Sequence, residues 1–131
     1  MSLCFDEVGR EIEVLDVTVI DNDILIMAEN PIFSEHVSYG DRIRVKVEKD
    51  IYYYVETLQK SELVRHSWLL SKEVSESSEI EQIKEAISRM EGRYEQVFGG
   101  VLVINVPKDA ERAIVSEVNA TIEKIDRGGL K

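Results

Sequence analysis

His36 and His66 are the only histidines in the 131-residue sequence, and each lies close to a serine. A serine nucleophile and its histidine base must sit within hydrogen-bond reach of one another. Closeness in Ser34-Glu35-His36 or His66-Ser67 is no evidence for such a pair, because adjacent residues of an extended segment point to opposite sides. We therefore predict no catalytic residue and lean towards a non-enzymatic protein.

Three other features of the sequence bear on metal or phosphate binding. Asp21-Asn22-Asp23 begins like a calcium loop, but Ile26 and Ile32 stand where that loop needs a glycine and a glutamate. Cys4 is the single cysteine and has no metal-ligand spacing. Gly99-Gly100 precedes a predicted strand, whereas phosphate-binding glycines precede a helix. We expect no metal and no cofactor.

A basic row, Arg42, Arg44 and Lys46, follows one face of a predicted strand. It could contact phosphates, with Tyr52 and Tyr54 of the next strand stacking on bases, as in small barrels that bind single strands. The net charge of −10 opposes this reading. We expect the row to pair within the sheet with the acids of the first two strands, which makes nucleic acid a disfavoured partner.

Acidic residues are concentrated at the start of the chain, where residues 1–29 hold eight acids and one base, a net charge of −7. Such a field repels nucleic acid and anionic lipid and favours basic partners. Our leading prediction is a protein-binding module for a basic protein, one version being an immunity-type protein that neutralises a toxin. Asp21, Asp23 and Glu29 are the candidate contacts. A solvated acidic face that only keeps the protein soluble is the alternative reading.

Two other functional classes stay open. A small enzyme or ligand-binding protein could use a cleft between the two halves of the chain, with Tyr52, Tyr54 and His66 as candidates. Binding of single-stranded nucleic acid by the basic row is the third class.

The first half of the chain has the two-residue period of half-buried strands from Glu11 to Thr57. Ile12 and Val14 alternate with acids, but the apolar parity then switches, which predicts a bulge near Val14-Leu15-Asp16. We predict a four-stranded antiparallel, barrel-like sheet over residues 1–62. Its turns lie at Asp21-Asn22-Asp23, at Gly40-Asp41, where Gly40 should have positive φ, and at Lys49-Asp50.

The second half, residues 63–131, has a different pattern. Strands are predicted at 64–70, 94–98 and 101–106, and helices after a Ser78 N-cap and after Pro107. The order β-α-β-β-α matches a ferredoxin-like unit without its final strand, with both helices on one face. The fold class is therefore α+β, with two subdomains.

Three features of the sequence indicate where in the cell the protein is located. The chain has one cysteine, no apolar run near the roughly 20 residues of a membrane span, and an acidic N-terminus where a signal peptide would be basic. We expect a cytoplasmic protein with no membrane contact.

Three segments carry a family resemblance: Asn30-Pro31-Ile32-Phe33, Val37 to Asp41, and Gly99 to Pro107. Through them the chain resembles an uncharacterised bacterial family, the domain of unknown function 4265. The resemblance implies an N-terminal barrel-like sheet and a C-terminal α+β part, and it transfers no functional residue.

Overall fold

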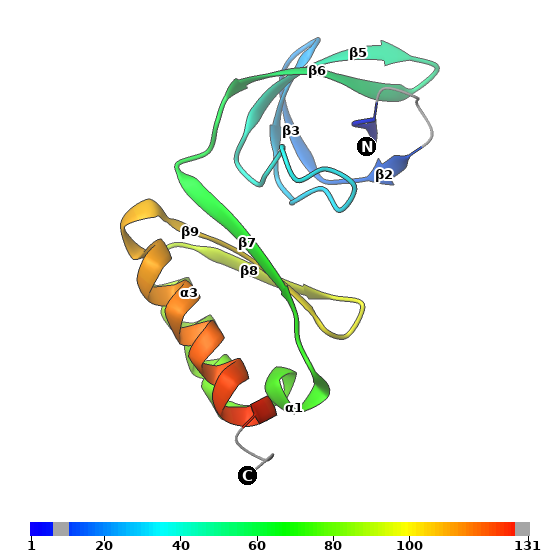
Figure 1. Cartoon of the computed structure of the whole chain (residues 1–131). Coiled ribbons are helices and arrows are strands. Elements are labelled where there is room, and N and C mark those ends of the chain that lie inside the picture. The colour runs from blue at the N-terminus through cyan, green and yellow to red at the C-terminus, as the bar shows by residue number, and fades with distance from the viewer. Residues whose placement is uncertain (7–10, 128–131) are drawn as a thin grey trace. The chain divides into compact units, whose positions relative to one another are not determined.

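The structure is a computed structural model that describes residues 1–6 and 11–127. Its described part is mixed α+β, as the sequence predicts. The chain divides into two compact units, unit 1 (Met1–Glu62) and unit 2 (Leu63–Lys131), and each is described by itself (Figure 1). No helix within the described ranges is long and apolar enough to cross a membrane.

Unit 1 is a curled sheet with strand order β2-β1-β6-β5-β4-β3 (Figure 1). Neighbouring strands are antiparallel except for β1 and β6. Only Leu15 and Asp16 separate β2 from β3, so the two ends of this order are held together by the chain and the sheet curls. The strands are β1 (Ser2–Cys4), β2 (Ile12–Val14), β3 (Val17–Asp21), β4 (Ile24–Met27), β5 (Arg42–Glu48) and β6 (Ile51–Gln59).

The prediction of four strands is therefore corrected to six. The segment expected as one bulged strand forms β2 and β3, which occupy opposite ends of the sheet order. The register shift lies between Val19 and Asp21, not near Val14. The predicted β2 orientation is also wrong: Val14 is 78% exposed, whereas Glu13 is 7% exposed. Glu13 and Leu15 are two residues apart and both buried, so the same alternate residues face the core on either side of Val14, and the predicted switch does not occur.

The predicted turns of unit 1 are present. Gly40 has φ +88°, which confirms the expected positive value, and Lys49 and Asp50 both have positive φ, as a tight hairpin turn between β5 and β6 requires. The core of the unit consists of Leu3, Leu15, Leu25, Met27, Val37, Ile43 and Val45.

Unit 2 has a three-stranded antiparallel sheet in the order β7-β9-β8, with helices packed on one face. Alternate residues Leu102, Ile104 and Val106 of β9 pack against the apolar faces of both long helices. The ferredoxin-like description of this unit stays a prediction. The elements are β7 (Leu63–Leu69), α1 (Lys72–Ser75), α2 (Ser78–Arg89), β8 (Arg93–Val97), β9 (Val101–Pro107), α3 (Lys108–Ile122) and a π-helical end, η1 (Glu123–Arg127).

The start of α2 corrects the predicted N-cap by one residue. Ser77 is the cap, and its hydroxyl accepts a hydrogen bond from the Ile80 amide at 3.2 Å. The Ser78 hydroxyl instead donates to Glu79 at 3.0 Å. Adjacent serines give the sequence two equivalent caps, and burial of Ile80, Ile83 and Ile87 selects between them.

Candidate functional site

The connection from β4 to β5, residues 28–41, has no helix or strand but is held by buried polar side chains. The two carboxylate oxygens of Glu13 accept from the amides of Ile32 (2.7 Å) and Phe33 (3.0 Å). The Asn30 side-chain oxygen accepts from the Tyr39 amide at 2.9 Å. These bonds fix an otherwise irregular loop in one conformation.

Asp41 anchors the far end of the same loop. Its fully buried carboxylate accepts from the amides of Ser38 (2.9 Å) and Ser61 (2.7 Å) and from the Lys60 ammonium (2.7 Å). Lys60 also donates to the backbone oxygen of His36 at 2.6 Å. A buried carboxylate is tolerated only when it is paired and hydrogen-bonded in this way. The loop is therefore a built element of unit 1.

The apolar side chains of Ile32 and Phe33, which we call the loop tip, remain 50% and 55% exposed. Glu29, half-buried, and Glu35, exposed, flank them in the sequence. Protein–protein interfaces usually have apolar residues at the centre and charged residues at the rim. A rigid loop also loses less conformational entropy on binding. Sequence reasoning missed this site because Glu13 has the pattern of a solvent-facing strand acid.

The predicted acidic contacts do not form one cluster. Asp21 and Asp23 lie before β4 and Glu29 lies after it, and four strand residues span about 13 Å. The Asp21 carboxylate accepts from the Asn22 amide at 2.8 Å, as a turn residue does. Asp23 lies 3.5 Å from Arg44.

Two residues of the basic row contact acids of the same unit, but only one of these acids comes from the start of the chain. Besides contacting Asp23, Arg44 binds Glu56 at 3.0 Å, and Lys46 binds Glu48 at 3.2 Å. Arg42 is exposed. Among these partners only Asp23 of Arg44 belongs to the acidic first 29 residues, whereas Glu56 lies on β6 and Glu48 on β5, the strand of Lys46 itself.

The tyrosines predicted to accompany that row face the other way. Tyr52 and Tyr54 pack against the core of unit 1, and the Tyr54 hydroxyl is 2.8 Å from that of Thr57. The cross-strand neighbour of Lys46 is Tyr53. The interpretation of Tyr52 and Tyr54 as a base-stacking surface beside the basic row is therefore wrong.

His66 is bound within unit 2. Its Nε2 lies 2.5 Å from a carboxylate oxygen of Glu111 on α3, and its ring stacks on Trp68. The Trp68 indole N–H donates to Asn119 of α3 at 3.1 Å. These contacts hold β7 against α3. Ser67 is the next residue of the same strand, so its side chain points to the face opposite that of His66.

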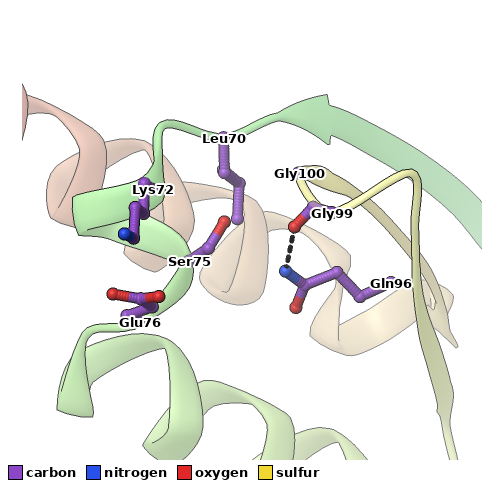
Figure 2. A pocket seen from close by; sticks show the side chains of 7 residues that line it. All are labelled: Leu70, Lys72, Ser75, Glu76, Gln96, Gly99 and Gly100. Atoms are coloured by element: carbon purple, nitrogen blue, oxygen red, sulfur yellow. Dashed lines mark hydrogen bonds between the residues drawn. The ribbon is translucent and has the colours of Figure 1, made fainter.

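A cavity of about 440 Å³ lies in unit 2, beside α1 and the β8–β9 turn (Figure 2). Its lining includes Ser75, whose hydroxyl oxygen is buried and has no hydrogen-bond partner in the described part of the chain. We predicted no helix before the Ser78 N-cap, because a four-residue helix such as α1 has too little periodicity to be recognised. The lining residues are Leu70, Lys72, Ser75, Glu76, Gln96, Gly99 and Gly100.

Comparisons with known proteins find one family and one solved structure that are similar to this chain. The model of the family described as "Domain of unknown function (DUF4265)" matches residues 13–130. A solved structure, described as a hypothetical protein from Neisseria gonorrhoeae, is 15% identical, with a TM-score of 0.65 over 92% of this chain and 87% of that chain. At that identity the similarity shows the fold alone. No curated protein matches the chain.

Proposed function

We propose that this chain, which belongs to the family of the domain of unknown function 4265, is a protein-binding module that uses the loop tip of unit 1. The observation that supports the proposal is the pair of hydrogen bonds from the Ile32 and Phe33 amides to the buried Glu13 carboxylate. They fix the backbone at two residues whose large apolar side chains are exposed.

The charge of unit 1 supports a basic partner. Residues 1–62 hold fourteen acids and six bases, a net charge of −8 out of the −10 of the whole chain. Such a field accelerates encounter with a cationic surface, while a desolvated apolar anchor supplies most of the affinity. A basic toxin neutralised by an immunity-type contact is one such partner.

Site-specific photo-crosslinking in cells of the source organism tests the proposal. A benzophenone amino acid replaces Phe33 in one variant and Val55 in the other, since Val55 on β6 is 52% exposed and matches the 55% of Phe33. We expect one dominant cross-linked protein of basic sequence at position 33 but not at position 55. The purified complex should weaken as ionic strength rises.

Matched charge variants separate the loop conformation from the acidic field. Glu13→Gln and Glu11→Gln each remove one negative charge, but only Glu13 binds the loop amides. We expect Glu13→Gln to abolish the cross-link and Glu11→Gln to retain it. Equal cross-linking at positions 33 and 55, or equal effects of the two glutamine variants, would contradict the proposal.

A further inference from the structure

The cavity of unit 2 has fixed walls. The Leu70 amide donates to the Gly100 backbone oxygen at 2.7 Å, which joins the end of β7 to the β8–β9 turn. A Cβ atom at Gly100 would lie 2.7 Å from the Leu70 backbone oxygen, so the two segments approach closely only because residue 100 is glycine. α1 is held in place by its residue Val74, which is fully buried in the core of unit 2.

Gln96 forms part of the wall and is not free to serve a ligand. Its amide nitrogen donates to the Gly99 backbone oxygen at 2.7 Å (Figure 2). Its amide oxygen accepts from the Lys84 ammonium at 3.0 Å. The polar side chains left for a ligand are therefore on α1 and at its C-cap: the Ser75 hydroxyl and the charged ends of Lys72 and Glu76.

The Ser75 hydroxyl is available because it makes no hydrogen bond to residues 1–6 or 11–127. In Figure 2 it points to the side of α1 on which the Gly99–Gly100 turn lies. Its oxygen is buried and unpartnered among the described residues. Rotation about the Cα–Cβ bond into the cavity would thus break no hydrogen bond, and a ligand acceptor or donor there would satisfy the hydroxyl.

Lys72 and Glu76 add opposite charges to the same wall. They are four residues apart, but with the lysine first, which is the less favourable order for a pair within a helix. Within the described ranges neither side chain forms an ion pair. The wall therefore offers a cation and an anion four residues apart in the sequence, and the Ser75 hydroxyl belongs to the same wall.

We propose that this cavity binds a small zwitterion of the free α-amino acid class, its carboxylate on Lys72, its ammonium on Glu76, and one carboxylate oxygen on Ser75. About 440 Å³ is at the lower end of the range for small-molecule sites, which suits a metabolite of this size. Leu70 supplies an apolar part of the lining, which an aliphatic group of the ligand would contact. The site lies wholly in unit 2 and is independent of the loop tip in unit 1.

The test is a titration of the full-length ¹⁵N-labelled protein with each of the twenty free L-amino acids, followed by amide chemical shifts. We expect at least one to shift residues 70–76 and 96–100. For that compound, its N-acetyl and carboxamide derivatives, which each lose one charge, should bind at least tenfold more weakly. Lys72→Gln, Glu76→Gln and Ser75→Ala should each weaken binding, whereas Glu85→Gln and Arg89→Gln, an exposed pair on α2, should not.

The derivatives and variants together identify which charged group of the ligand binds Lys72 and which binds Glu76. In Glu76→Gln, N-acetylation should cause no further loss, and in Lys72→Gln, amidation should cause none. The proposal is overturned if none of the twenty amino acids shifts these amides, or if the neutral derivatives bind as tightly as the parent. Equal sensitivity to the α2 variants would also overturn it, because binding would then follow overall charge.

Discussion

Replacement of Ser75 by alanine should stabilise the ligand-free protein. The Ser75 hydroxyl is buried in the free structure without a hydrogen-bond partner among the described residues. Most buried hydroxyls are bonded, so their removal destabilises a protein; here the side chain loses water on folding and gains nothing in return. The sign of the stability change therefore reports whether the hydroxyl is truly unpartnered.

The magnitude follows from two contributions. An unsatisfied buried polar group costs about 1–3 kcal/mol, of which rotation towards the cavity can recover a part. Alanine is also the better helix former, by about 0.5 kcal/mol. Because the side chain borders an existing cavity, its truncation opens no new void in the core. We expect a gain of about 1 kcal/mol, which is about 7 °C in Tm if unit 2 unfolds as one cooperative domain.

Urea denaturation followed by circular dichroism measures this gain, with Ser88→Ala as the matched control. Ser88 is an exposed serine in α2, so its replacement changes helix propensity without changing a buried hydroxyl. Ser75→Ala should exceed Ser88→Ala by about 0.5 kcal/mol or more. A loss of stability in Ser75→Ala would mean that the hydroxyl is hydrogen-bonded, and would refute our assignment of a free donor in the cavity.

Three further variants test single features of the fold. Gly40→Val should lower stability by about 2 kcal/mol or more, since φ is +88° and a Cβ would lie 2.7 Å from the Ser61 hydroxyl; Gly99→Ala, at φ +78° with open space around it, should cost less in the same melting assay. Asp50→Gly should raise Tm by relieving a positive φ of 67° in the β5–β6 turn. A hydrogen bond from Lys124 lowers the pKa of Glu79 below its ordinary 4.5, so this contact stabilises the fold above pH 4.5 and is lost as pH falls through the lowered pKa. Lys124→Gln should raise the midpoint of the Glu79 carboxyl NMR titration.

Strand positions were predictable because the two-residue period reflects burial directly. β5 alternates as expected, with Ile43 and Val45 buried, and its tight turn into β6 is where the sequence places it. β1 was missed because Ser2–Cys4 is three residues long and has no alternation to recognise. The long helices of unit 2 were predicted from their start signals, a serine cap and Pro107, and the spacing of Ile80, Ile83 and Ile87 gives α2 its one apolar face.

The candidate sites could not be predicted in the same way, because each depends on contacts between residues far apart in the sequence. Glu13 lies nineteen positions from Ile32, and its alternation with Ile12 and Val14 indicates the opposite orientation. The Ser75 cavity forms only when the Gly99–Gly100 turn meets α1. The local sequence pattern indicates which residues are apolar. It does not indicate which buried acid will accept a hydrogen bond from the backbone amide of a distant loop.

The acidic first segment shows why charge alone was a poor guide to the contact surface. Of its acids, Glu13 is buried as a loop anchor, Asp23 meets Arg44, and Asp21 holds its own turn. Charges used in this way are partly neutralised or screened by the fold, so the net −7 overstates the field that a partner would meet near them. What the acids contribute instead is the conformation of the loop, because a carboxylate can accept from two amides at once. A partner would then be selected first by the exposed Ile32 and Phe33 side chains, and only secondarily by charge.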